Sequence, residues 1–189
     1  MRQFKTSKGK LIVFSAPSGT GKTAIKNALL QKDPTLVFSI SATTRQKREG
    51  EHDGKDYYFI SEAEFKEHID HKDFIEYDHH FGNFYGTLRM AVEPDLQMGC
   101  NVVMDIDVNG ALAVKKNYPE ESVLIFIKPP SLEELKRRLM SRGSETEESI
   151  KVRLARVEEE MKHAGEFDHV VVNDTVERAA SEILDIIRQ

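Results

Sequence analysis

"LIVFSAPSGTGKT", residues 11–23, contains a loop that is typical of phosphate binding. The loop matches the pattern G-x-x-x-x-G-K-[ST], except that Ala16 stands at the position of the first glycine. This position comes where the chain leaves a strand, before most of the backbone N–H groups that would contact phosphate, so an added methyl group changes little. We interpret the loop as a working nucleotide site; a glycine-rich turn that binds no nucleotide is the alternative.

The segments on either side of the loop support this interpretation. Residues 11–15 form a short apolar run, which predicts a buried strand. A helix should begin at Gly21 or Lys22 and run to about Gln31, because a proline follows Asp33 and disfavours helix at the residue before it. A loop between a buried strand and a helix start is the context in which this pattern binds phosphate.

The loop offers several kinds of group to a nucleoside triphosphate. Backbone N–H groups of residues 18–23 would surround the β-phosphate, and the helix that follows adds its positive N-terminal end. The Lys22 ammonium would reach the β- and γ-phosphates, and the Thr23 hydroxyl would bind Mg²⁺. Glycines leave the backbone open enough for this contact. The predicted triphosphate-binding residues are Ala16, Pro17, Ser18, Gly19, Thr20, Gly21, Lys22 and Thr23.

The composition is that of one soluble globular domain, with 39% hydrophobic and 31% charged residues in a chain of 189. The net charge of -5 argues against a nucleic-acid-binding protein, which would usually be basic. The single cysteine, Cys100, excludes an intramolecular disulfide and suits a reducing compartment. The apolar run at residues 11–14 is too short for a signal peptide or a membrane span. We therefore expect a cytoplasmic protein with no membrane partner.

Further apolar runs predict an α/β fold. Residues 35–41, 101–107, 122–128 and 169–173 predict four more strands, separated by helical segments. Such alternation is typical of a mostly parallel sheet with helices on both faces, which makes a three-layer core. The last helix should dock on this core through an apolar stripe, formed by Val176, Ala179, Ala180, Ile183, Leu184 and Ile187.

Two segments interrupt this alternation. Residues 42–95 are polar and hold four of the five tyrosines, which suggests a small antiparallel lobe inserted after the second core strand. Residues 131–163 are strongly charged, and a solvated helical hairpin is their simplest interpretation. Two capping-box patterns predict its helices, joined at Arg142-Gly143: Ser131 with Glu134, and Ser144 with Glu147.

The phosphate loop alone leaves GTPases, ATPases and kinases open, but the sequence has no N-K-x-D guanine motif of the GTP-binding switch proteins. Over essentially its whole length the chain resembles the guanylate kinases, a family that tolerates alanine at the first loop position. The motifs that carry the resemblance are APSGTGKT (16–23), SATTRQKREGEHDGKDYYF (41–59), IEYDHHFGNFYGT (75–87), MDIDVNG (104–110) and RLMSRGSETEESIKVRL (138–154).

The resemblance implies a P-loop fold and a reaction. The family transfers the γ-phosphoryl group of Mg·ATP to GMP, giving ADP and GDP in purine nucleotide metabolism, with dGMP as a further acceptor. The implied parts are a core at 8–40, 96–130 and 162–189, a GMP-binding lobe at 41–95, and a helical lid at 131–161.

The resemblance also implies residues for the acceptor. Two arginines, whose guanidinium groups suit phosphate oxygens, and two tyrosine hydroxyls would hold the GMP phosphate. A carboxylate can accept the N1–H and N2 donors of guanine, whereas adenine presents an acceptor at N1. Taken alone, a glutamate such as Glu76 would more often be a surface carboxylate at a strand edge. The implied acceptor residues are Arg45, Arg48, Tyr57 and Tyr85 for phosphate, Glu76, Ser41 and Thr87 for the base, and Asp107 nearby.

For the transfer itself, the resemblance implies catalytic Lys22 and Arg45, with the arginines of the lid, Arg138, Arg142 and Arg153. Positive groups are needed because the passing phosphoryl group carries charge on its equatorial oxygens. No general base is needed, because a nucleotide phosphate is already largely dianionic at neutral pH. Asn173 would lie near the adenine of ATP.

Asp105 would hold Mg²⁺ through a water molecule, unless it only caps its strand. A separate metal site at Asp78, His79 and His80 is a less favoured possibility, since adjacent histidines on a polar turn are usually solvated. The competing functions are a kinase-like binding module that has lost catalysis and a kinase for another nucleoside monophosphate. The intact loop argues against the first and Glu76 against the second. The oligomeric state is left open by the sequence.

Overall fold

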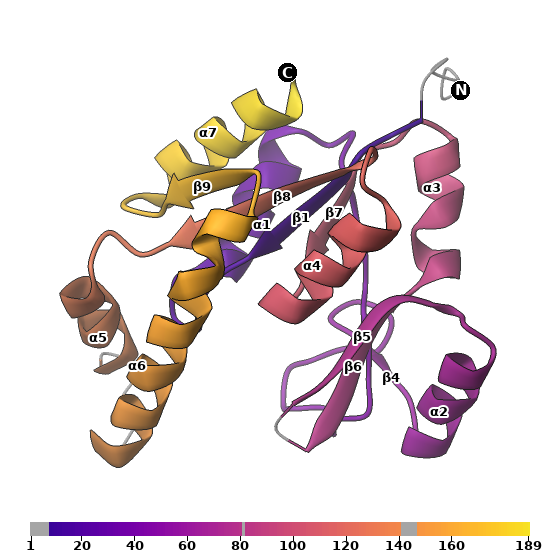
Figure 1. The fold of residues 1–189 in the computed structure, drawn as a ribbon, viewed down its shortest axis with the longest axis horizontal. Coiled ribbons are helices and arrows are strands. Elements are labelled where there is room, and N and C mark those ends of the chain that lie inside the picture. The colour runs from indigo at the N-terminus through magenta and orange to yellow at the C-terminus, as the bar shows by residue number, and fades with distance from the viewer. Residues whose placement is uncertain (1–7, 81, 141–146) are drawn as a thin grey trace. The chain divides into compact units, whose positions relative to one another are not determined.

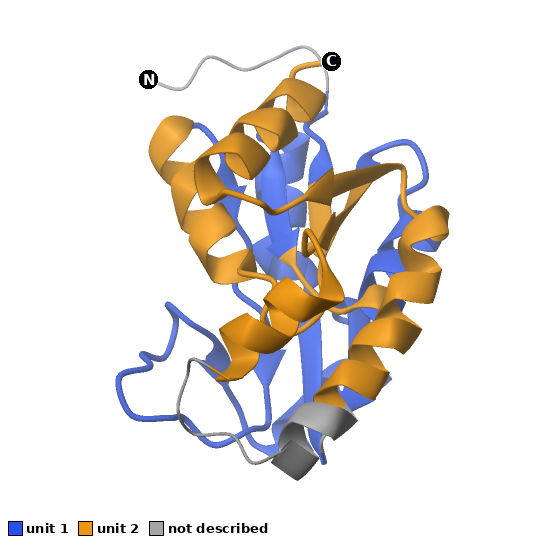
Figure 2. Cartoon of the chain, turned by 90° about the vertical axis from the view of Figure 1, so that its left-hand side faces the viewer, with its two compact units in different colours: residues 1–11, 35–104, 109–122 blue, residues 12–34, 105–108, 123–189 orange. Residues whose placement is uncertain are grey.

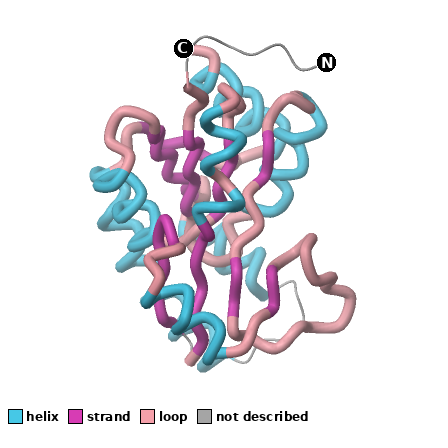
Figure 3. Tube along the Cα trace, turned by 90° about the vertical axis from the view of Figure 1, so that its right-hand side faces the viewer, coloured by secondary structure: helices cyan, strands magenta, loops and turns pink. Residues whose placement is uncertain are grey.

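The computed structural model describes residues 8–80, 82–140 and 147–189. Within these ranges the chain alternates between strands and helices (Figures 1 and 3). The strands are β1 (Leu11–Ser15), β2 (Val37–Phe38), β3 (Ala42–Thr43), β4 (Tyr58–Phe59), β5 (Phe74–His80), β6 (Asn83–Leu88), β7 (Val102–Asp105), β8 (Ser122–Lys128) and β9 (His169–Val172). The α-helices are α1 (Lys22–Lys32), α2 (Glu62–Asp70), α3 (Glu93–Gln97), α4 (Val108–Asn117), α5 (Leu132–Met140), α6 (Glu147–Lys162) and α7 (Val176–Ile187), with 3₁₀ turns η1 (Arg89–Ala91) and η2 (His163–Glu166).

The larger sheet has the strand order β2-β7-β1-β8-β9, and the pairs β2–β7 and β8–β9 are parallel. In the second pair the register runs from Ile125 opposite His169 to Lys128 opposite Val172. Every residue of β1 is buried, as expected for a central strand of a sheet covered by helices. The predicted α/β fold with a mostly parallel sheet is confirmed.

Two strands are shorter than their apolar runs predicted. The run at 35–41 forms only β2, because this strand lies at the edge of the sheet and pairs on one side, through Val37 N–H to the Asn101 carbonyl (3.0 Å) and Ser39 N–H to the Val103 carbonyl (2.9 Å). The run at 101–107 ends as β7 at Asp105, because the chain turns into α4 at Val108. An apolar run predicts which residues are buried, and buried residues extend beyond the hydrogen-bonded part of the strand.

The described chain divides into two compact units (Figure 2). One comprises the residues up to 11, 35–104 and 109–122, and we call it the acceptor unit. The other comprises residues 12–34, 105–108 and 123–189, and we call it the loop unit. This division differs from the division into core, lobe and lid, which stays a prediction.

The acceptor unit contains a second sheet in the order β4-β3-β6-β5. The pairs β3–β6 and β5–β6 are antiparallel, but β3–β4 is parallel, so the prediction of an antiparallel lobe is wrong for this pair. The long connection between β3 and β4 allows parallel pairing, because it carries the chain back so that β4 runs in the same direction as β3. The Tyr58 N–H then donates to the Ser41 carbonyl (2.9 Å) and the Ile60 N–H to the Thr43 carbonyl (3.0 Å).

An aromatic cluster fixes α2 against this sheet. Phe65 of α2 is fully buried, and its ring stacks on Phe74 and Phe84 at centroid distances of 4.3 and 5.2 Å. The helix begins after Ser61, whose hydroxyl accepts the Glu64 N–H (3.1 Å). Burial of these rings holds β5 and β6, which carry several of the predicted acceptor residues, in a fixed register.

In the loop unit, α7 packs beside α1 through the predicted apolar stripe. Ala179, Ala180, Ile183 and Leu184 are buried, which confirms the centre of the stripe, whereas Val176 and Ile187 near its ends are only half-buried. Thr175 caps the helix. The charged segment forms α5 and α6, as predicted, and these helices share a small core of Leu135, Leu139 and Val157.

The first capping pattern is partly confirmed. The Ser131 hydroxyl accepts the Glu134 N–H (3.1 Å), as a helix cap should. The Glu134 carboxylate is engaged instead by the arginines that follow it on α5. The second pattern, at Ser144, lies outside the described residues.

Among the described residues, no helix combines the length and the apolar character that crossing a membrane requires.

Candidate active site

The phosphate loop leaves β1 at Ser15 and enters α1 at Lys22. Ala16 is only 6% exposed and lies in the buried first part of the loop, where its methyl group is packed. The Thr20 N–H donates to the Pro17 carbonyl (3.1 Å), which closes a tight turn. The backbone N–H groups at the start of α1 have no partners within the helix, which makes this end suitable for an anion.

Two glycines of the loop are required by its geometry. Gly19 and Gly21 have φ values of 88° and 97°, in the left-handed region that favours glycine. A Cβ atom on Gly19 would lie 2.8 Å from Cδ2 of Leu139, and one on Gly21 would lie 2.8 Å from Nδ2 of Asn173. The loop is therefore packed closely against α5 on one side and against Asn173 on the other.

Lys22 and Asp105 form an ion pair, with Nζ 3.1 Å from Oδ1. Lys22 is the first residue of α1, and Asp105 is the last residue of β7. This contact joins two predicted site residues at the carboxyl end of a parallel strand, where ligands of open α/β sheets bind. Thr23 follows on α1 with its side chain exposed.

Asn173 is the residue that holds the loop from the side of β9. It is 2% exposed, and its Nδ2 donates to the Thr20 carbonyl at 2.6 Å. Its Oδ1 and the Thr20 hydroxyl are both buried without a hydrogen-bond partner in the described part of the chain. The family resemblance implied a place near adenine for Asn173; the structure adds a contact with the loop backbone itself.

Two arginines of the predicted lid reach the same region of the loop unit. Arg138 on α5 donates from Nε to Glu134 (2.8 Å) and from Nη2 to the Asn173 carbonyl (3.4 Å). Arg153 on α6 donates from Nη1 to the Ser18 hydroxyl (3.5 Å). The third predicted arginine, Arg142, lies outside the described residues.

Glu134 organises the arginines of α5. It binds Arg137 through two hydrogen bonds, at 2.7 and 2.8 Å, and also accepts from Arg138. The hydrogen bonds from Arg137, and then those from Arg138, lower the pKa of Glu134 to about 2. From the sequence, Glu134 was predicted only as part of a helix cap. The sequence signal for the contact was the spacing of four residues between Glu134 and Arg138, which makes the two side chains neighbours on a helix.

In the acceptor unit, three predicted base-contacting residues form a chain of polar contacts. The Thr87 hydroxyl donates to Oε1 of Glu76 (2.6 Å), and the Ser41 hydroxyl lies 3.3 Å from that of Thr87. Glu76 and Thr87 are opposite each other in the β5–β6 register. Glu76 is only 6% exposed, which contradicts its reading as a surface carboxylate at a strand edge.

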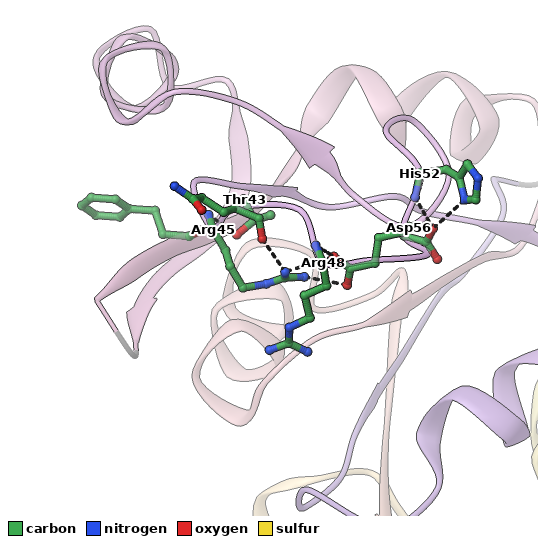
Figure 4. Close-up of polar contacts among 8 residues, drawn as sticks. Thr43, Arg45, Arg48, His52 and Asp56 are labelled. Atoms are coloured by element: carbon green, nitrogen blue, oxygen red, sulfur yellow. Dashed lines mark hydrogen bonds and ion pairs between the residues drawn. The ribbon is translucent and has the colours of Figure 1, made fainter. Parts of the chain in front are cut away.

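Arg45 lies in the turn between β3 and β4, beside Thr43 and Arg48 (Figure 4). Its guanidinium group also contacts two aromatic rings and a carboxylate. Its Nη1 and Nη2 atoms donate to the two carboxylate oxygens of Glu51, at 3.0 and 2.8 Å. Its guanidinium carbon is 5.5 Å from the centroid of Tyr57, and the Tyr57 ring meets Tyr85 edge-on at 6.2 Å. The Arg48 N–H donates to Glu51 (2.8 Å), while the Arg48 side chain is exposed.

The pairing of Arg45 with Glu51 keeps both groups charged. The hydrogen bond from Arg45 is the main cause that lowers the pKa of Glu51 below its usual value. The hydrogen bond to Glu51 likewise raises the pKa of Arg45, against the effect of burial. Glu51 was not predicted as a site residue from the sequence, although it follows Arg48 by three positions on a polar turn.

The structure therefore brings the predicted residues together in two groups. The triphosphate group in the loop unit comprises residues 16–23, Asp105, Arg138, Arg153 and Asn173; the acceptor group in the acceptor unit comprises Ser41, Arg45, Arg48, Tyr57, Glu76, Tyr85 and Thr87. Asp107 belongs to the loop unit, so its role beside the acceptor residues stays a prediction.

Comparison with known proteins is consistent across sequence and fold. The family model described as guanylate kinase matches residues 8–189. The chain is 50% identical over 185 residues to a guanylate kinase of Chlorobaculum tepidum, with 96% of this chain and 95% of that protein covered. It is 46% identical over 186 residues to a guanylate kinase of Bacteroides thetaiotaomicron, with 98% and 91% covered. The crystal structure of guanylate kinase from Anaplasma phagocytophilum matches with a TM-score of 0.81 at 35% identity, covering 98% of this chain and 88% of that chain.

Proposed function

The chain belongs to the guanylate kinase family, and from this premise we propose that its two groups of residues transfer the γ-phosphoryl group of ATP to GMP. The observation that carries the assignment of the acceptor is the buried carboxylate of Glu76, which lies in a polar chain with Thr87 and Ser41. A buried carboxylate needs hydrogen-bond donors, and a guanine base offers two that are adjacent.

Base selection follows from this requirement. Glu76 accepts the N1–H and N2 amino donors of guanine, while Ser41 and Thr87 contact the remaining edge. Adenine would place the lone pair of N1 against the Glu76 carboxylate, so that two hydrogen-bond acceptors would face each other. Sites built around such polar complementarity reject the wrong base by several powers of ten.

The GMP phosphate is held by Arg45, Arg48, Tyr57 and Tyr85. The proximity of Arg45 to the Tyr57 ring, and of Tyr57 to Tyr85, supports this set. A guanidinium group remains charged in a site closed to water, and its planar donors match phosphate oxygens. Asp107 completes the acceptor set on family resemblance.

ATP is bound at the phosphate loop. The backbone N–H groups of residues 18–23 surround its β-phosphate, and the Lys22 ammonium moves from Asp105 toward the β- and γ-phosphates. Asn173 contacts the adenine edge while it holds the loop. Arg138, Arg142 and Arg153, from a lid at 131–161, surround the phosphoryl group in transit and exclude water, which would otherwise hydrolyse ATP.

The donor set near the loop fits Mg²⁺. A hydroxyl at Thr23 and a carboxylate at Asp105 are the oxygen ligands that Mg²⁺ prefers, and Mg²⁺ takes few protein ligands because phosphates and water supply the rest. Thr23 would bind the ion directly and Asp105 through a water molecule. When bound, Mg²⁺ neutralises charge on the β- and γ-phosphates. The carboxylate of Asp105 also keeps Lys22 in place before ATP arrives.

The wider role we propose is the recycling of GMP and dGMP in the cytoplasm. Transfer needs no catalytic histidine or cysteine, because the acceptor phosphate is itself the nucleophile. Rate acceleration then comes from positioning and electrostatic stabilisation. The single cysteine of the sequence suits a reducing compartment.

The test is ADP formation from Mg·ATP in a coupled assay, with GMP, dGMP, AMP, CMP or UMP as the acceptor. We expect turnover with GMP and dGMP and background rates with the other three. Turnover with AMP or a pyrimidine nucleotide instead would assign the chain to another acceptor. Binding of GMP by calorimetry without turnover would identify a binding module that has lost catalysis.

A further inference from the structure

The half-buried Glu51 contacts both predicted phosphate-binding arginines of the acceptor turn. We define the acceptor turn as residues 44–57. Both carboxylate oxygens of Glu51 bind the Arg45 guanidinium, and one of them also accepts the Arg48 N–H. The Glu51 N–H in turn donates to the Arg48 carbonyl at 3.2 Å. One side chain therefore holds both predicted phosphate-binding arginines, Arg45 by its guanidinium and Arg48 by its backbone.

The donors of Arg45 are divided between the protein and an open edge. Nη1 donates to the Gln46 carbonyl (2.7 Å) and to Glu51, and Nη2 donates once to Glu51. Neither Nε nor the second N–H of Nη2 is bonded to any described residue. These two remaining donors lie on the same edge of the guanidinium and can bind two oxygens of one phosphate.

The backbone of Arg45 is fixed as well. Its N–H donates to the Thr43 hydroxyl (3.2 Å), which itself donates to the Phe84 carbonyl on β6 (2.9 Å). The side chain is thus held at both ends, by Thr43 at the backbone and by Glu51 at the guanidinium. Only 13% of the Arg45 side chain and 20% of the Glu51 side chain are exposed, so solvent screening of the pair is reduced.

We propose that Glu51 is a positioning residue of the acceptor site, which turns the Nε–Nη2 edge of Arg45 toward the phosphate of GMP. This proposal rests on the proposed function, since it assumes that Arg45 binds that phosphate. An opposite effect competes with it. The negative charge of Glu51 repels a phosphate, so a carboxylate that only neutralised Arg45 would weaken GMP binding. Removing the Glu51 charge therefore separates the two roles: weaker GMP binding would indicate positioning, and tighter GMP binding would indicate that Glu51 only neutralises Arg45.

The variant that tests the sign is Glu51→Gln. Glutamine can still accept the Arg48 N–H and preserve the turn, but it cannot accept both Nη groups of Arg45. We expect the dissociation constant of GMP, measured by calorimetry, to rise about tenfold, the effect of losing one charge-assisted hydrogen bond. The inhibition constant of guanosine, which has no phosphate, and the KM for ATP should stay unchanged, because the base-contacting residues are untouched.

Asp56→Asn is the matched control. Asp56 lies in the same turn and accepts the His52 N–H at 2.8 Å, but it contacts no arginine in the part of the chain that the structure describes (Figure 4). We expect wild-type affinity for GMP from this variant. Equal weakening by both substitutions, or weaker guanosine binding in Glu51→Gln, would show that the turn has merely lost its structure and would overturn the proposal.

A double-mutant cycle isolates the contact with Arg45. In an Arg45→Ala background, Glu51→Gln should no longer weaken GMP binding and should strengthen it slightly, since only repulsion is removed. The same weakening in both backgrounds, or tighter GMP binding in the single variant, would overturn the positioning role. A wild-type protein that neither binds nor phosphorylates GMP would instead refute the proposed function itself.

Discussion

The phosphate loop of residues 16–23 and the acceptor turn of residues 44–57 are both proposed to bind phosphate, but they are built by different means. In the loop, the shape of the backbone makes the site: two glycines have left-handed φ angles, and Asn173 and α5 pack against them. In the acceptor turn, side chains make the site, and the Arg45 guanidinium is oriented by the carboxylate of Glu51.

The difference shows which substitutions each region tolerates. A backbone-built site depends on φ angles and on space, so a small residue is accepted at position 16, where the chain is buried and packed. A site built from side chains depends on the chemistry of each group and on its partner. Substitutions that preserve shape and change charge should therefore damage the acceptor residues more than the loop, except at Lys22.

The largest effect should come from Lys22→Ala, which removes the one side-chain charge that the loop itself brings to the triphosphate. We expect kcat to fall about a thousandfold, because this charge stabilises the transition state. The dissociation constant of GMP should change little. Lys32→Ala, at the other end of α1, is the control and should keep wild-type kcat. A fall in kcat of less than tenfold in Lys22→Ala would mean that the backbone groups of the loop stabilise the transition state without this charge.

Glu76→Gln should have the next largest effect, since it keeps the shape and removes the charge. Glutamine presents a donor where guanine also presents one, so kcat/KM for GMP should fall about a hundredfold. The unfolding midpoint in urea should remain close to that of the wild type. Glu67→Gln, exposed on α2, is the matched control. Unchanged kcat/KM for GMP would remove Glu76 from the base site.

Gly21→Ala should have a smaller effect, through shape alone. Its Cβ would meet Asn173 at 2.8 Å, and alanine at a φ of 97° is strained by about 1–2 kcal/mol. We expect the KM for ATP to rise about tenfold and the KM for GMP to stay the same. Gly165→Ala is the control, because a Cβ atom there would meet nothing within 4 Å, and it should keep wild-type KM values. An equal rise of the KM for ATP in both variants would mean that the effect of Gly21→Ala does not come from the close approach of Asn173.

Sequence patterns predicted most of the fold because the strands and helices are marked by local signals. The buried strand before the loop, the α5–α6 hairpin and the stripe of α7 each follow from apolar spacing or from caps. The parallel pairing of β3 with β4 could not be predicted in this way, because it depends on how the acceptor turn folds back. β3 and β4 have two residues each, too few to give a periodic pattern in the sequence.

The candidate site was predictable where a residue has a fixed place in a motif and not where it acts through another side chain. Lys22 and Glu76 were identified from motif positions, and both lie among the other predicted residues of their unit. Glu51 and Glu134 were missed because a carboxylate near arginines on a polar segment is usually a solvated surface charge. Only the three-dimensional contacts distinguish these two from the many other acidic residues of the chain.

A cluster in the acceptor unit tests whether an arginine–carboxylate pair is enough to indicate a phosphate site. Arg89 donates to Glu93 (3.0 Å) and to the Tyr118 hydroxyl (2.7 Å), and Tyr118 donates to Glu93 (2.6 Å). The cluster joins α3 to the end of α4, and none of its residues is in the predicted acceptor group. We expect it to contribute to stability without affecting activity.

Tyr118→Phe should therefore leave kcat and both KM values unchanged and lower the free energy of unfolding by about 1 kcal/mol at pH 7.

Burial, and then the hydrogen bond to Glu93, raise the pKa of Tyr118 to about 12 from 10.0. Above pH 10 the unfolded chain releases the tyrosine proton while the folded chain keeps it. The contribution of Tyr118 is thus complete below pH 10 and is lost as the pH rises toward 12. Urea titrations at pH 7, 9 and 11 should show a decline above pH 10 that is shallower in Tyr118→Phe. Identical pH profiles would show that Tyr118 titrates alike in both states, and reduced activity at pH 7 would mean that this cluster, like the Arg45–Glu51 pair, supports the site.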